Sequence, residues 1–253
     1  MRSGLAQRRQ RDTQKNELKP HLKKTWCIGQ INAAFLAQME RLLWLYSLPV
    51  DTGFPVVCFD ERPCFLIGDT VTSLTLKAGS VRREHYEYEK NGSCALLAAI
   101  EPKTGKRLAQ VHDHRRKREY ALFLKELAAR YPRAVKIRLV QDNLNTHNTS
   151  SLYETFPAEE AFALAQRFEF YYTPKKASWL NMQEIEFSAL ARQCLHRRIA
   201  TKAELEREVG AIVKERAAKA VKIEWQFTIA SARAKLNRHY ESVQAENVRY
   251  KET

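Results

Sequence analysis

Apolar residues fall into several short runs that predict β-strands. The segments PVVCFD (55–60) and KIRLVQD (136–142) are apolar on both faces, which is typical of strands in the middle of a sheet. A third run, FEFYYT (168–173), stops before Pro174, and residues 64–68 predict a further short strand. Turn residues beside the runs CALLAAI and LAQVHDH predict an antiparallel hairpin. The chain should therefore contain a sheet of several strands.

Apolar residues that recur every three or four positions predict helices between and after these strands. Ile31, Phe35, Met39 and Leu42 have this spacing. Thr201 is a suitable N-cap for a helix that begins after it. The predicted helices cover residues 26–48, 117–131, 158–168, 178–198 and 201–220. Hairpin strands followed by alternating strands and helices predict an α/β fold with a mixed sheet flanked by helices.

Two of the predicted central strands end in an aspartate directly after the apolar run. Asp60 ends the first strand and Asp142 ends the second. If these strands are parallel neighbours, their carboxyl ends coincide at the edge where open α/β sheets bind ligands. Asp60 and Asp142 are then expected to face each other. Taken singly, each has a simpler explanation, since Asp60 could pair with Arg62 and Asp142 could cap the next turn.

A third carboxylate stands out on the helix predicted from Ser178. At about 100° per residue, Glu184 falls within the apolar stripe that contains Leu180 and Phe187, whereas Glu186 points about 160° away. A carboxylate that faces the core is costly unless it is paired, protonated or bound to a metal. Three carboxylates without a nearby CxxC or HxxxH favour Mg²⁺ or Mn²⁺ over zinc. Two such ions could activate a water and stabilise a leaving oxygen in phosphoryl transfer.

Composition limits the classes of protein to consider. The 253 residues are 44% hydrophobic and 28% charged, which is typical of a globular protein with one large domain or a domain and an appendage. No apolar run approaches the length of a membrane helix, and no apolar stretch follows the basic start, so neither a membrane span nor a secretory signal is expected. Five cysteines without a CxxC pair predict reduced thiols in the cytoplasm.

Charge points to a polyanionic partner. The formal net charge is +14, from 43 Lys and Arg against 29 acids. The basic residues are concentrated in residues 1–24 and in the segment HDHRRKR (112–118). Simple solubility would not require such clusters, so nucleic acid is the favoured partner.

Three segments resemble the acidic blocks of the DDE transposases, in particular those of the bacterial insertion sequence 630 family, which is related to the mariner elements. These segments are VVCFDE, LVQDNLNTH and YYTPKKASWLNMQEIEFS. The flanking segments LKPHLKKTWCI, QCLHRRI and IEWQFTIASARAKL also fit, so the resemblance extends from about Leu18 onward.

The resemblance implies a ribonuclease-H-like fold in which Asp60, Asp142 and Glu184 are the catalytic residues and the ligands of two Mg²⁺ or Mn²⁺ ions. It also implies a cut-and-paste reaction, in which water cleaves the transposon ends and the freed 3′-hydroxyl attacks target DNA. The implied partner is double-stranded DNA, both transposon ends and target, bound by a homo-oligomer. The implied location is the bacterial cytoplasm, with nucleoid association when the protein is bound to DNA.

Further residues of the matched blocks are expected to orient a carboxylate or to contact a phosphate. They are Asn143, Asn145, His147, Trp179 and Asn181. His147 has the alternative role of capping a turn, and Trp179 that of packing. Glu61 is close to Asp60 in sequence, but it lies on the opposite face of an extended strand and is not expected to be a ligand.

The chain departs from the family pattern in two places. Full-length relatives carry helix-turn-helix domains ahead of LKPHLKK, where this chain has only a basic segment. The expected domains are a basic arm at 1–24, as a remnant of a missing DNA-recognition region, and a catalytic domain at 25–253. The spacing from Asp142 to Glu184 is longer than usual, which predicts an insertion near 150–160. Two alternative functions are an inactive DNA-binding remnant and another ribonuclease-H-like nuclease.

Overall fold

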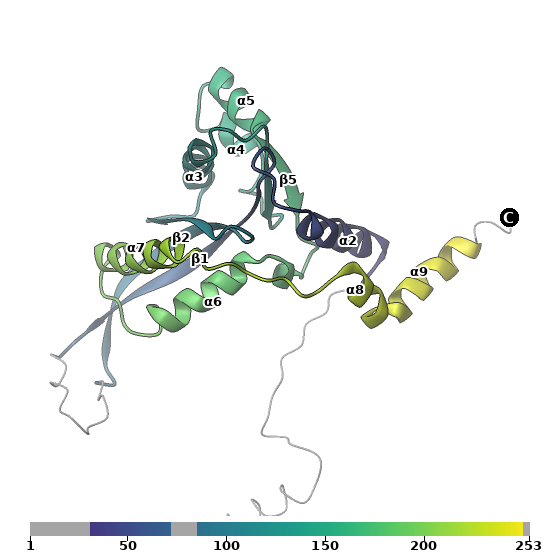
Figure 1. Cartoon of the computed structure of the whole chain (residues 1–253). Coiled ribbons are helices and arrows are strands. Elements are labelled where there is room, and N and C mark those ends of the chain that lie inside the picture. Colours follow the sequence, from purple (N-terminus) through teal and green to yellow (C-terminus); the bar gives the residue numbers. More distant parts are fainter. Residues whose placement is uncertain (1–30, 72–84, 250–253) are drawn as a thin grey trace, which may run out of the picture.

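The computed structural model describes residues 31–71 and 85–249, and within them it contains a mixed five-stranded sheet flanked by helices (Figure 1). The strands are β1 (Val56–Asp69), β2 (Tyr88–Glu101), β3 (Lys106–His112), β4 (Ile137–Gln141) and β5 (Phe168–Tyr172). Their spatial order is β3-β2-β1-β4-β5. The first three strands form an antiparallel meander, and β4 and β5 run parallel to β1. The mixed sheet predicted from the sequence is therefore confirmed, while the arm at 1–24 lies outside the described residues.

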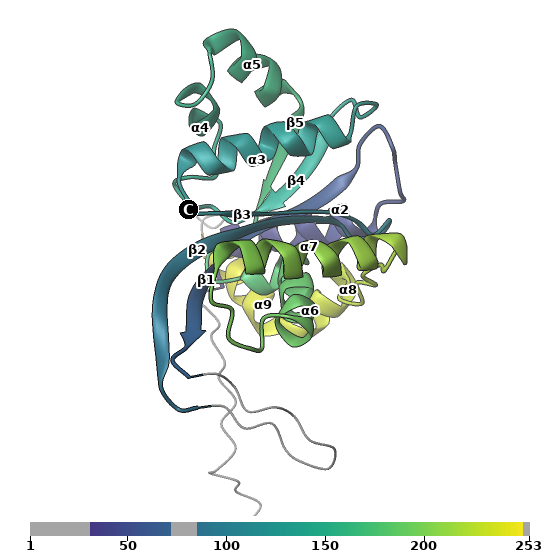
Figure 2. The same cartoon turned by 90° about the vertical axis from the view of Figure 1, so that its left-hand side faces the viewer.

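The strand predicted at 64–68 is wrong as a separate element, because β1 continues unbroken through it. β2 pairs with β1 from Cys58 to Asp69, with one irregularity near Phe65. β4 pairs with β1 only as far as Cys58, so Pro63 faces an edge of β1 that β4 does not cover. A proline that cannot donate a ladder hydrogen bond is tolerated at such an edge. Beyond that point β1 and β2 extend as a long two-stranded ribbon (Figure 2).

Helices cover both faces of the sheet. They are α2 (Ala33–Ser47), α3 (Lys117–Arg130), α4 (Ser150–Tyr153), α5 (Ala158–Gln166), α6 (Gln183–Gln193), α7 (Lys202–Ala218), α8 (Ile229–Lys235) and α9 (Asn237–Arg249). α3, α4 and α5 lie on one face, and α6 and α7 lie on the other (Figure 2). Thr201 caps α7, as predicted, by accepting a hydrogen bond of 3.1 Å from the Glu204 N–H.

The alternation of side chains along β1 separates the two cores. Val57 and Phe59 point into the cluster that also contains Tyr120 and Phe123 of α3. Cys58 points to the opposite face, into a cluster with residues of α2. Residues 150–160, where the sequence predicts an insertion, form α4 and the start of α5 and pack against the first of these clusters. Because successive side chains of a strand point to opposite faces, Asp60 points to the same face as Cys58, and Glu61 points to the face covered by α3.

The carboxyl-terminal helices pack against α2 and then project away from the sheet (Figure 1). Arg233 of α8 forms a two-pronged ion pair with Glu40 of α2, with nitrogen–oxygen distances of 2.7 and 2.9 Å. Tyr240 of α9 donates a hydrogen bond of 2.6 Å to the same carboxylate. Across the described ranges, no helix has the length and apolar character needed to span a membrane.

Candidate metal centre

Asp60 and Asp142 come together at the edge where β1 and β4 lie side by side. The two strands are parallel, and Cys58 is in register with Val140. Asp60 lies two residues after Cys58 on β1. Asp142 lies two residues after Val140 and is the first residue after β4. The sequence-based prediction that these strands are parallel neighbours is confirmed, and it explains why the two carboxylates meet.

Asp60 is held in place by the third acidic block. Its Oδ1 accepts a hydrogen bond of 2.8 Å from the Glu61 N–H, and the Asn181 amide approaches its Oδ2 at 3.3 Å. The same Asn181 amide nitrogen donates to the Phe59 carbonyl at 2.8 Å. Asn181 is only 1% exposed, so this contact is shielded from water. Asn181 therefore joins the segment before α6 to β1 beside the first carboxylate.

Asp60 is largely buried, and it lies near enough to Glu184 and Asp142 to be affected by their charges. Burial raises the pKa of Asp60 to about 7, although the Glu61 N–H opposes the shift. The value of about 7 is the net result: repulsion from Glu184 and then from Asp142 also contributes to the rise in pKa, and the His147 imidazole opposes it. Proximity of like charges disfavours the ionised form of a carboxyl. Neutralising cations are the natural complement of such a group.

Asp142 is oriented by His147, whose Nδ1 forms a short contact with the Asp142 Oδ1. On the other side of the ring, the His147 Nε2 lies 3.6 Å from the Oε2 of Glu61. Burial disfavours the charged imidazole, but the contacts with Asp142 and Glu61 prevail and raise the pKa of His147 to about 9. Sequence reasoning placed Glu61 on the face opposite Asp60 and missed this contact with His147. The alternation along β1 was the available signal, since it directs Glu61 toward α3.

The helix-face assignment of Glu184 and Glu186 was wrong. Glu186 is buried, at 2% exposure, and Glu184 is half-buried. The reason is that the helix does not begin at Ser178. Residues Ser178–Leu180 form a short 3-10 turn, and α6 begins only at Gln183, so the apolar side of α6 has a different phase.

Glu186 instead lies between two arginines. Its carboxylate pairs with Arg107 of β3 at 2.8 and 3.2 Å and with Arg216 of α7 at 2.9 and 3.0 Å. Burial would raise the pKa of Glu186, but the hydrogen bonds and charges of the two arginines prevail and hold it below its usual value. Glu186 is thus a structural anion that ties α6 to β3 and α7. Glu184 remains the carboxylate of α6 that acts electrostatically on Asp60.

Among the described residues, the side chains of the other predicted residues form no hydrogen bond or ion pair with the three carboxylates. Asn143 and Asn145 are exposed, and the Asn145 carbonyl accepts a hydrogen bond of 2.7 Å from Asn148. Trp179 is 47% exposed and meets Phe227 edge to face, with ring centroids 5.6 Å apart. The packing alternative for Trp179 therefore has a contact to support it.

The chemistry of the three carboxylates suits a hard divalent cation, although their oxygens do not converge on one point. As the side chains stand in the described ranges, no three His, Cys, Asp or Glu side chains enclose a possible metal position. Asp60 and Asp142 turn toward Asn181 and His147, respectively, which is expected for carboxylates that repel one another. Carboxylate oxygens are the ligands that Mg²⁺ and Mn²⁺ prefer.

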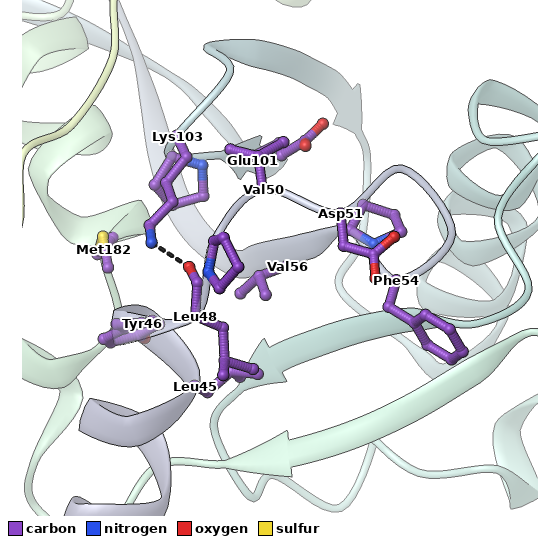
Figure 3. Close-up of a pocket in the computed structure, with 13 residues that line it drawn as sticks. Leu45, Tyr46, Leu48, Val50, Asp51, Phe54, Val56, Glu101, Lys103 and Met182 are labelled. Carbon is purple, nitrogen blue, oxygen red and sulfur yellow. Dashed lines mark hydrogen bonds between the residues drawn. The ribbon is translucent and has the colours of Figure 1, made fainter.

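A small pocket near the start of β1 is a poor alternative site. It has a volume of about 30 Å³, roughly one water molecule, and its lining includes Tyr46, Val56 and Lys103 (Figure 3). The Lys103 ammonium donates to the Leu48 carbonyl, and both residues line the pocket (Figure 3). None of the three carboxylates lines it.

Comparison with known proteins gives the family of this fold and site. The family model of the DDE superfamily endonucleases matches residues 55–206, a range that contains all three carboxylates. This is more than half of the 253 residues, and the chain belongs to the DDE superfamily endonucleases. The sequence-based assignment to the DDE superfamily is thereby confirmed. No curated protein matches the chain by sequence.

Solved structures of Mos1 transposase share the fold. The paired-end complex with the left transposon end has a TM-score of 0.55 at 11% identity, covering 86% of this chain and 66% of that chain. A pre-cleavage Mos1 transpososome has a TM-score of 0.53 at 12% identity, covering 88% and 71%. The Mos1 mariner paired-end complex with Mn has a TM-score of 0.52 at 13% identity, covering 87% and 71%. The chain thus spans about two thirds of the Mos1 chains, and the predicted ribonuclease-H-like fold is confirmed.

Proposed function

We propose that this chain is the catalytic part of a DNA transposase of the insertion sequence 630 family, related to the mariner elements. The observation that carries the proposal is that parallel pairing of β1 with β4 brings Asp60 and Asp142 to one edge of the sheet, with Glu184 of α6 near enough to act on Asp60. Asp60 of β1 has a pKa of about 7, raised by burial and then by repulsion from Glu184 and Asp142. Membership of the DDE superfamily endonucleases and the basic net charge of +14 support a phosphodiester substrate.

Asp60, Asp142 and Glu184 would hold two Mg²⁺ or Mn²⁺ ions. Such ions, when bound, lower the pKa of an attacking water and neutralise charge on the leaving oxygen of a phosphodiester. The protein's own task is to present the carboxylates. Asn181 orients Asp60, and His147 orients Asp142. The ion pairs of Glu186 fix α6, the helix that carries Glu184.

The reaction that fits is hydrolysis of a phosphodiester at a transposon end, followed by attack of the freed 3′-hydroxyl on target DNA. Both steps displace an oxygen from phosphorus, so one set of carboxylates serves both. We expect a homo-oligomer on DNA, because two transposon ends must be held together. We expect the reaction to take place in the bacterial cytoplasm, at the nucleoid.

A basic hollow beside the site would receive a DNA phosphate backbone. It has a volume of about 490 Å³ and is lined by Asn32, Phe35 and Gln38 of the α2 region and by Lys175 and Lys176. The lysines follow β5, whose end is paired with the end of β4 next to Asp142. Within the described ranges, neither lysine has a carboxylate at ion-pair distance, so both charges are available to a ligand. Lys176 also has a positive φ of 63°, an uncommon conformation that the surrounding loop must maintain.

Amide substitutions test the assignment. Asp60→Asn, Asp142→Asn and Glu184→Gln should each abolish Mn²⁺-dependent nicking of duplex DNA while the far-ultraviolet circular dichroism spectrum stays native. The matched control is Asp113→Asn, since Asp113 is an exposed acid paired with Lys202 at 3.0 Å and should be dispensable for cleavage. Normal nicking by any of the three site variants would refute its role. Preferential cutting of RNA–DNA hybrids would favour another ribonuclease-H-like nuclease instead.

A further inference from the structure

His147 lies between two carboxylates, one on β1 and one directly after the end of β4. Its Nδ1 contacts the Asp142 Oδ1, and its Nε2 lies 3.6 Å from the Glu61 Oε2. The second distance is an ion-pair distance and exceeds that of a direct hydrogen bond. Asp142 is a candidate metal ligand, whereas Glu61 points to the opposite face of the sheet.

The imidazole has no freedom to turn. His147 is 0% exposed, and its ring stacks on Tyr120 with centroids 4.9 Å apart and meets Phe59 edge to face at 5.2 Å. Its backbone carbonyl accepts hydrogen bonds from Gln141 at 2.8 Å and from Tyr172 at 3.2 Å. Because both the ring and the backbone are held, Nδ1 stays directed at Asp142 and Nε2 at Glu61.

Glu61 is fixed as well, and it touches both halves of the candidate site. Its side chain is 6% exposed, and its backbone N–H donates to the Asp60 Oδ1 at 2.8 Å. Its other side-chain partner, Arg115, is 57% exposed at a distance of 3.4 Å. Exposed ion pairs contribute little, so the pairing with Arg115 does not account for a buried carboxylate at this position. The buried imidazole is the partner that matters.

We infer that Glu61 is a positioning residue, which acts through His147 to fix the orientation of the Asp142 carboxylate relative to Asp60. The inference rests on the proposed function, because it takes Asp60 and Asp142 as metal ligands. A carboxylate that orients a histidine next to a metal site is a recurring arrangement, and removing such an outer partner weakens metal binding by roughly 10- to 100-fold. Here the histidine orients a carboxylate ligand rather than binding the metal itself.

The test is a double-mutant cycle on the full chain, with the dissociation constant of Mn²⁺ measured by isothermal titration calorimetry. Glu61→Gln should weaken Mn²⁺ binding by about tenfold or more. His147→Gln should weaken it at least as much, and the double variant should match His147→Gln because the two residues act in series. Arg115→Gln, which removes the exposed partner of Glu61, should bind Mn²⁺ like the wild type. Wild-type affinity in folded Glu61→Gln, or fully additive losses, would overturn the inference.

A second measurement needs no metal. In the metal-free protein, the ¹³C carboxyl chemical shift of Asp142 should change in Glu61→Gln and stay unchanged in Arg115→Gln. The change should disappear when Glu61→Gln is made in the His147→Gln background. An Asp142 carboxyl chemical shift that is the same in Glu61→Gln as in the wild type would overturn the inference.

These measurements separate the inference from the proposed function. Absence of Mn²⁺ binding by the wild type would count against the proposed metal centre, and the carboxyl shift of Asp142 would then decide the role of Glu61 alone. If Glu61→Gln does not fold, Glu61→Asp replaces it in both measurements. That variant keeps the charge but withdraws it from His147, and unchanged values for both affinity and shift would overturn the inference.

Discussion

The guanidinium of Arg107 and the carboxylate of Glu186 form a two-pronged ion pair that is buried between β3 and α6, at 2.8 and 3.2 Å. Removing one partner of a buried pair leaves an uncompensated charge and costs about 3–5 kcal/mol. Glu186→Gln should therefore lower the free energy of unfolding by roughly this amount, because Arg107 and Arg216 both lose their anion. Urea unfolding at pH 7 measures it. A solvent-facing Glu186, as the sequence predicted, would instead give almost no change.

The pH dependence of this loss follows from the depressed pKa of Glu186. A carboxyl with a lowered folded-state pKa stabilises the protein above its unfolded pKa, and the contribution is lost as pH falls through the folded value. The difference between wild type and Glu186→Gln should therefore shrink in acid. Glu215→Gln serves as the control, because Glu215 forms an exposed pair with Lys219 and its loss should not be measurable. A gap that stays constant into acid would contradict the ion-pair explanation.

Asp60 should have the opposite pH dependence in the presence of a chelator. Its folded-state pKa, about 7, lies above the ordinary value of 3.8, so the folded state holds its proton longer than the unfolded chain. The free energy of unfolding must then fall as pH rises from about 4 to about 7. Asp60→Asn cannot ionise and should be the more stable protein above pH 7, by about 1–3 kcal/mol. Thermal melts in EDTA from pH 4 to pH 8 measure this, and curves that run parallel would contradict the raised pKa.

The meeting of Asp60 and Asp142 could be predicted because it depends on local patterns and topology. Apolar runs on both faces indicated central strands, and parallel neighbours bring their carboxyl ends to one edge. The phase of α6 could not be predicted in the same way. It is set at Asn181, whose own backbone is extended between the 3-10 turn and α6 and whose side chain donates to the Phe59 carbonyl at 2.8 Å. Such a contact between distant segments leaves no periodic signal.

The role of Glu61 escaped sequence reasoning for a related reason. The alternation along β1 correctly placed its side chain opposite that of Asp60. On that face Glu61 lies near His147, which belongs to the loop after β4 and packs on Tyr120 of α3. This arrangement forms only when β1, the loop after β4 and α3 have folded together. Pattern analysis of β1 alone therefore excluded Glu61 as a ligand and assigned it no other role.

Divalent metal should stabilise the folded chain through the three carboxylates. An ion that binds only the folded state, at a hundred times its dissociation constant, adds about 2.7 kcal/mol. Mn²⁺ should therefore raise the melting temperature of the wild type, and the shift should vanish in the double variant Asp60→Asn, Asp142→Asn. Zinc should be a poor substitute, since the site offers no thiol or cluster of imidazoles. An equal Mn²⁺ shift in the double variant would place the ion elsewhere.

The basic hollow predicts how DNA binding responds to salt. Each duplex phosphate neutralised by a lysine contributes about −0.9 to the slope of log K against log salt concentration. Lys175→Gln with Lys176→Gln should therefore make the slope shallower by about 2, as measured by fluorescence anisotropy on random duplex DNA in EDTA. The matched control is Arg133→Gln with Lys136→Gln, which removes the same charge just before β4, at the far end of that strand from Asp142. The control slope should equal that of the wild type. Equal changes in the two pairs would mean that only net charge matters, and an unchanged slope in the lysine variant would place the DNA outside this hollow.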